Sequence, residues 1–112
     1  MIEVQLLLDT ARCLVGLSTE GHAVRNAGEA SIPCAAVSSL VRTAARTVEG
    51  RAGIESSGSA PHPGSLELTL HRVDAASREW LRGITDFLIV GLKDIEADYP
   101  EECRIVLNTQ EE

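Results

Sequence analysis

Large aromatic side chains are almost absent from this sequence, since only Trp80, Phe87 and Tyr99 occur among 112 residues. A hydrophobic core therefore has to be built mainly from Leu, Ile, Val and Ala. Long apolar runs are absent too, and none approaches the ~18 residues of a membrane-spanning helix. The segment 1–13 lacks the basic start and apolar stretch of a signal peptide. We expect a single cytoplasmic domain over residues 1–112, with no membrane partner.

Cysteine is scarce and odd in number, with only Cys13, Cys34 and Cys103. No CxxC pair occurs, so a disulfide framework or a zinc finger is not indicated. The three histidines share no metal-ligand spacing with one another, and the chain has no P-loop and no dinucleotide fingerprint. The sequence therefore predicts no metal and no other cofactor.

Positive charge is in deficit, because 10 Lys and Arg face 17 Asp and Glu, for a net charge of -7. Phosphates repel such a chain, so we expect no direct binding of nucleic acid. An acidic surface attracts a basic partner, such as a ribosomal protein. The alternative is that the acidic residues simply keep the protein soluble, which is the commoner reason for such an excess.

The apolar pattern predicts four strands. Residues 2–8 and 12–19 are apolar runs around the short turn 9–11, which is typical of an antiparallel hairpin. Residues 65–72 alternate strictly between leucine and polar residues, as in a half-buried strand. Residues 103–108 form a closing strand.

Two helices complete the predicted fold. Apolar residues at helical spacing follow Cys34 as far as Gly50, and Pro33 suits the first turn of such a helix. A second helix is expected over 75–98, with Asp74 as its N-cap. Residues 50–64 are rich in Gly, Ser and Pro and are predicted to be a flexible connection. The order ββαβαβ favours an α+β, two-layer sandwich of about four mostly antiparallel strands, with both helices on one face.

Cys34 stands where a long loop, residues 20–33, ends and the first helix begins. Backbone N–H groups at a helix start point outward, and the helix dipole adds partial positive charge. Both stabilise a thiolate, and the same N–H groups suit the oxyanion of a tetrahedral intermediate. The competing interpretation is that Cys34 is a small buried residue, as free cysteines often are.

His22 lies in the same loop, twelve residues before Cys34. A loop of this length is able to bring an imidazole back over the helix start, and histidine is the usual base for activating a thiol. The alternative is an exposed loop histidine. The pair is more informative than either residue, because the loop that carries the histidine leads to the cysteine.

The stretch Gly21-His22-Ala23, followed by a glycine-containing loop and I-P-C-A-A-V-S, resembles the signature of the ribosomal-processing cysteine protease family, Prp. This resemblance implies that His22 is the general base, Cys34 the nucleophile and Ser38 a neighbour of the site. It also implies a homodimeric α+β sandwich. The implied substrate is the N-terminal extension of large-subunit ribosomal protein number twenty-seven.

Two departures from the family pattern affect the site. Ser31 stands where the family usually has Asp, three residues before the cysteine, and Pro33 replaces Val. Serine carries no charge, so the sequence supports a dyad rather than a triad. The departures also leave open a catalytically silent homodimer that binds a basic ribosomal or assembly partner without cutting it.

Overall fold

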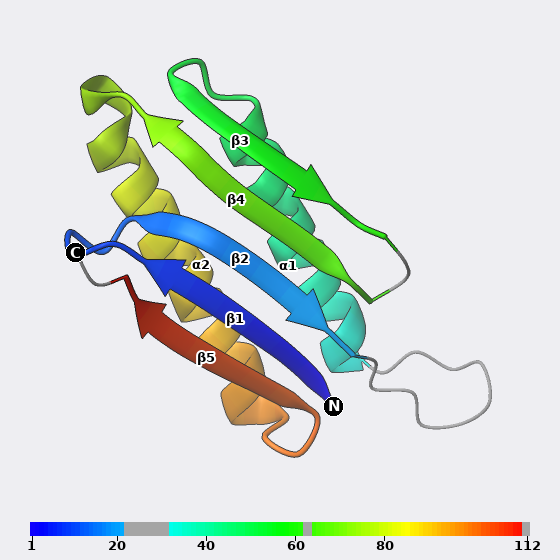
Figure 1. Cartoon of the computed structure of the whole chain (residues 1–112). Coiled ribbons are helices and arrows are strands. Elements are labelled where there is room, and N and C mark those ends of the chain that lie inside the picture. Colours follow the sequence, from blue (N-terminus) through cyan, green and yellow to red (C-terminus); the bar gives the residue numbers. More distant parts are fainter. Residues whose placement is uncertain (22–31, 62–63, 111–112) are drawn as a thin grey trace.

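The computed structural model describes residues 1–21, 32–61 and 64–110, which form five strands and two α-helices (Figure 1). In chain order these are β1 (Ile2–Leu8), β2 (Leu14–Glu20), α1 (Ile32–Glu49), β3 (Ile54–Ser59), β4 (Leu66–Val73), α2 (Arg78–Asp98) and β5 (Cys103–Thr109). A short 3-10 turn, Ala75–Ser77, precedes α2. The order ββαββαβ has one strand more than the predicted ββαβαβ.

The strands form one mixed sheet in the order β3-β4-β2-β1-β5. The neighbours β1 and β2, β2 and β4, and β3 and β4 are antiparallel, whereas β1 and β5 run parallel. Both helices cover the same face of the sheet (Figure 1). The predicted α+β class, the β1–β2 hairpin and the single helical layer are therefore confirmed.

The prediction of a flexible connection over 50–64 was wrong, because β3 lies within it. β3 is an edge strand that pairs only with β4, and all of its residues after Ile54 and Glu55 are Ser or Gly. Only Ile54 is buried. An exposed edge strand needs no alternation of apolar residues, so it left no periodic signal in the sequence.

The core lies between the sheet and the helices. Every second residue of β1 is buried, and the intervening Glu3 and Gln5 stand on the other face. In β4 the alternation predicted from the leucines is confirmed, since Leu68 and Leu70 are buried while Glu67 and Thr69 are exposed. One face of the sheet is thus apolar and covered, and the other is largely polar.

Helix α1 begins two residues earlier than predicted, at Ile32, and Pro33 and Cys34 lie in its first turn. Proline is well suited there, because its fixed φ is helical and its missing N–H would have had no partner within the helix. Most of the predicted apolar stripe is buried, namely Val37, Val41, Ala44, Ala45 and Val48, while Leu40 is half-buried against the core. The N–H of Gly50 donates to the Arg46 carbonyl at 3.0 Å, where the helix ends.

The segment predicted as one helix over 75–98 divides into the 3-10 turn and α2. Asp74 does act as a cap, because its side chain accepts a hydrogen bond from the Ser77 N–H at 2.9 Å. Leu81, Leu88 and Leu92 of α2 are buried in the core, as predicted. Neither of the two described helices is long and apolar enough to cross a membrane.

Candidate active site

Cys34 is the third residue of α1 and is half-buried, at the edge of the hydrophobic core. The first turn of a helix presents backbone N–H groups and the positive end of the helix dipole. The position predicted from the sequence is therefore confirmed: the sulfur lies at a helix start. This is the local environment that favours a thiolate and an oxyanion.

The other two cysteines differ from Cys34 in burial. Cys13 is 3% exposed and Cys103 is 1% exposed. Burial raises the pKa of the Cys13 thiol, and the nearby Asp9 carboxylate raises it further. Burial also raises the pKa of the Cys103 thiol, again with help from a carboxylate, that of Glu96. Both are therefore poor nucleophiles, which leaves Cys34 as the accessible cysteine of the chain.

Ser38 lies one helical turn after Cys34 and lines a cavity of about 550 Å³. The cavity is open to solvent and lies between α1, the end of β2 and residues flanking β3 and β4. Its walls are Thr19, Ser38, Val41, Arg42, Ala60, Pro61, Gly64, Ser65 and Leu66. The family resemblance implied Ser38 as a neighbour of the site, and that role stays a prediction. The cavity was not predicted, because its other walls come from distant segments that carry no shared motif.

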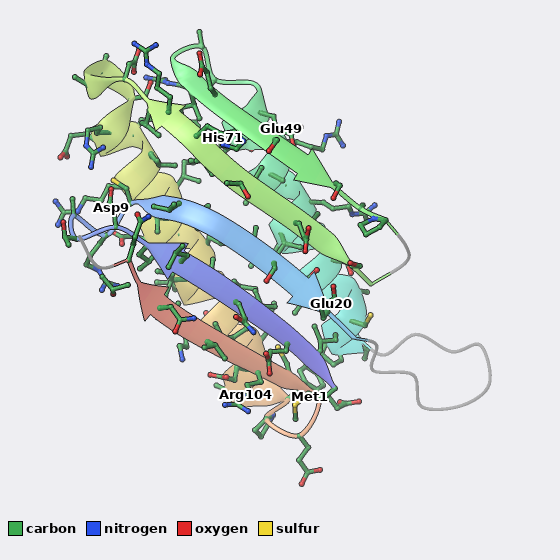
Figure 2. The ribbon with its side chains drawn as sticks, in the orientation of Figure 1. Met1, Asp9, Glu20, Glu49, His71 and Arg104 are labelled. Atoms are coloured by element: carbon green, nitrogen blue, oxygen red, sulfur yellow. The ribbon has the colours of Figure 1, made fainter. Side chains whose placement is uncertain are left out.

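The end of β2 and the start of α1 lie at the same end of the molecule (Figure 1). Glu20, the last residue of β2, is labelled at this end in Figure 2, and its carboxylate accepts a hydrogen bond from the Ser65 hydroxyl at 3.0 Å. Thr19 of β2 and Ser38 of α1 face one cavity. The two chain segments that flank residues 22–31 are thus close to each other.

Gly21 follows β2 with a φ of +97°, in the left-handed region that glycine adopts without strain. A Cβ atom at this position would clash with the carbonyl oxygen of Met1. The glycine of the Gly-His-Ala motif is therefore required by the backbone. His22 and Ser31, both predicted to belong to the site, lie outside the described residues.

No group of three or more His, Cys, Asp or Glu side chains that could hold a metal ion occurs in the ranges 1–21, 32–61 and 64–110. His71, the one histidine within these ranges, stands on the exposed face of β4, where its Nε2 lies 2.7 Å from the Ser57 hydroxyl (Figure 2). That position is remote from the start of α1.

Comparisons with known protein families and with solved structures point to the same family. The family model of the cysteine protease Prp matches residues 1–104. The ribosomal processing protease Prp of S. aureus, solved with a covalently linked product peptide, superimposes with a TM-score of 0.77 at 20% identity, covering 98% of this chain and 100% of that one. A Streptococcus mutans protein superimposes with a TM-score of 0.78 at 24% identity, covering 98% and 96%. No curated protein matches by sequence. The chain belongs to the Prp family of cysteine proteases.

Proposed function

We propose that this protein is a cysteine endopeptidase in which Cys34 is the nucleophile and His22 the general base. The observation that carries the proposal is the position of Cys34, half-buried in the first turn of α1 and one turn from a cavity of about 550 Å³. Membership of the Prp family and the Gly-His-Ala motif support the assignment of His22.

The reaction follows from these groups. The imidazole of His22 takes the thiol proton of Cys34, and the thiolate attacks the carbonyl carbon of the scissile peptide bond. N–H groups of the first turn of α1 stabilise the resulting oxyanion. The tetrahedral intermediate expels the amine, which receives the proton from the imidazolium. Water then hydrolyses the thioester, returning the proton to sulfur and releasing the carboxylic acid.

The proposed substrate is the N-terminal extension of large-subunit ribosomal protein number twenty-seven. The S. aureus protein with the same fold is a ribosomal processing protease, which supports this choice. Ribosomal proteins are basic, and a net charge of -7 favours their encounter with this chain. We further propose that residues 1–112 act as one protease domain in the cytoplasm. We also propose that the protein is a homodimer, and light scattering of the purified protein tests this oligomeric state.

The test is cleavage of the purified ribosomal protein, or of a peptide from its N-terminus, followed by mass spectrometry. We expect wild type to release the extension, and Cys34→Ala and His22→Ala to lose at least ~10³-fold in rate. His71→Ala is the matched control, since it removes an exposed histidine far from the start of α1 (Figure 2). Equal activity of Cys34→Ala and wild type would refute the mechanism. Binding without any cleavage would instead favour the catalytically silent module.

A further inference from the structure

The sheet has two edges, β3 and β5, and β5 has its one neighbouring strand, β1, on a single side (Figure 1). At one end of this pairing, the Ile2 N–H donates to the Glu102 carbonyl at 2.9 Å. At the other end, the Gln110 N–H donates to the Leu8 carbonyl at 2.7 Å. Because the backbone groups of successive residues face opposite sides of a strand, the even-numbered residues of β5 face β1. The odd-numbered ones face the outer edge, namely Cys103, Ile105, Leu107 and Thr109.

Two of the outward N–H groups of β5 have acceptors from α2 and its connection to β5. The Cys103 N–H donates to the Tyr99 carbonyl at 3.0 Å. The Ile105 N–H donates to Oε2 of Glu96 at 2.7 Å, and Glu96 lies in the last turn of α2. A carboxylate at this distance stands where the carbonyl of a sixth strand would have to lie. It is also a stronger acceptor than such a carbonyl, because it is charged.

The Glu96 carboxylate is held in this place by a second contact. Its other oxygen, Oε1, lies 3.3 Å from Nζ of Lys93, one turn earlier on α2. The hydrogen bond from Ile105 lowers the pKa of Glu96, burial opposes this, and Lys93 and Arg104 lower the pKa further. The side chain is therefore an anion at neutral pH, with one oxygen for the lysine and one for the strand.

The remaining half of the β5 edge has no such cover. Leu107 and Thr109 also face outward, and neither N–H donates a hydrogen bond to another residue within 1–21, 32–61 or 64–110. Leu107 is a large apolar residue that is 38% exposed. An exposed strand edge of this kind is a template for pairing with another strand.

The β5 strand of a second copy fits this template by symmetry. Antiparallel pairing of two identical strands about a two-fold axis at Leu107 would set Leu107 opposite itself. Ile105 would then lie opposite Thr109 of the second copy, and its N–H would need the carbonyl of that residue. Glu96 occupies the place of this carbonyl, so the pairing is blocked two residues from its centre.

We propose that Glu96 is an edge guard, whose carboxylate occupies the Ile105 N–H and keeps β5 from pairing with the β5 strand of a second copy. The guard is independent of the proposed reaction at Cys34. It excludes one surface, the β5 edge, from the proposed homodimer, and so keeps the sheet at five strands.

The test measures mass in solution by analytical ultracentrifugation over a range of protein concentrations. We expect Glu96→Ala to form species of twice the wild-type mass, at concentrations about tenfold lower than any such association of wild type. Glu96→Gln keeps a side-chain oxygen that accepts from the Ile105 N–H, and should behave as wild type. Asp98→Ala removes the same charge from an exposed position of α2 and should also behave as wild type.

A second pair of variants separates edge pairing from a weakened fold. Lysine on an edge strand opposes pairing, so Leu107→Lys in the Glu96→Ala background should restore the wild-type mass. Urea denaturation of the same double variant should show that the stability lost in Glu96→Ala is not regained. Ser59→Lys places the lysine on the other edge, in β3, and should leave the association of Glu96→Ala unchanged.

Four results would each overturn the proposal. They are a wild-type mass for Glu96→Ala at every concentration, equal association of Glu96→Gln and Glu96→Ala, association that persists after Leu107→Lys, and dissociation of wild type by Leu107→Lys alone. The last would mean that the edge is already in use. Peptide cleavage reports on the proposed function separately. A protein that cuts no peptide, but whose Glu96→Ala variant associates through β5, would sustain the guard and refute the protease.

Discussion

At the scale of single residues, the buried Thr85 joins two parts of the core. It is 0% exposed, and its hydroxyl donates to the Leu81 carbonyl at 2.8 Å and accepts from the Leu14 N–H at 3.0 Å. The second bond ties α2 to the start of β2. A buried N–H that loses its partner costs about 1–3 kcal/mol, so this one hydroxyl is important for stability.

Replacing the hydroxyl by a methyl group tests this. We expect Thr85→Val to lower the free energy of unfolding by about 2 kcal/mol, because the side chain keeps its shape while the Leu14 N–H is left without its acceptor. Thr85→Ser keeps the hydroxyl and should cost about 1 kcal/mol through the lost methyl group. Urea denaturation measures both. A valine variant as stable as wild type would show that water or another group satisfies Leu14.

Sequence reasoning at this scale succeeded where a residue's chemistry depends on its own neighbours in the chain. Cys34 at a helix start follows from the apolar spacing after it and from Pro33 before it. The buried role of Thr85 did not follow, because a threonine between apolar residues of a helix is ambiguous until its partner on β2 is known. The position of Arg42 in the wall of a cavity did not follow from the sequence either, because that cavity depends on the β3–β4 hairpin.

At the scale of elements, the β1–β2 turn is held by one carboxylate. Asp9 accepts hydrogen bonds from the N–H groups of Ala11 and Cys13, each at 2.9 Å, and from the guanidinium of Arg78 at 3.0 Å. Burial alone would raise the pKa of Asp9, but the bonds from Cys13, Arg78 and Ala11 outweigh it and hold the pKa below its ordinary value. The charged carboxylate is thus the form that the turn binds.

This arrangement predicts acid sensitivity. A carboxyl group whose pKa is lower in the folded state stabilises the protein above its unfolded pKa, about 4, and this stabilisation is lost as the pH falls through the folded value. We expect Asp9→Asn to be less stable than wild type at pH 7 by about 1 kcal/mol, and the difference to shrink below about pH 4. Urea denaturation at a series of pH values checks this, and a gap independent of pH would contradict it.

The elements themselves were predictable where one face of each is buried. The alternation in β1 and β4 and the helical spacing in α1 and α2 follow from that burial. The prediction failed for β3, whose Ser and Gly residues pair with β4 at an exposed edge. It also missed the parallel pairing of β5 with β1, because register and neighbour order depend on contacts between distant segments.

At the scale of the whole molecule, the acidic charge of the chain is opposite to that of the proposed ribosomal substrate. The net charge is -7, and any attraction between this chain and the proposed basic substrate acts over roughly 10 Å at 0.1 M salt. We expect kcat/KM for the intact ribosomal protein to fall several-fold between about 0.02 M and about 0.3 M salt. A short peptide of no net charge is the control and should change little. A flat salt dependence for the intact substrate would remove any role for the acidic surface.

The parallel pairing of β1 with β5 has a consequence for biosynthesis. Ile2 of β1 lies opposite Cys103 of β5, so β1, which is synthesised before the other described strands, waits for β5 before both of its edges are bonded. Until then the nascent hairpin of β1 and β2 exposes a row of unpaired backbone N–H and C=O groups, together with the leucines that are buried in the completed fold. The growing chain therefore passes through a stage in which a chaperone that covers this edge is an advantage. That stage ends only when β5 has been synthesised.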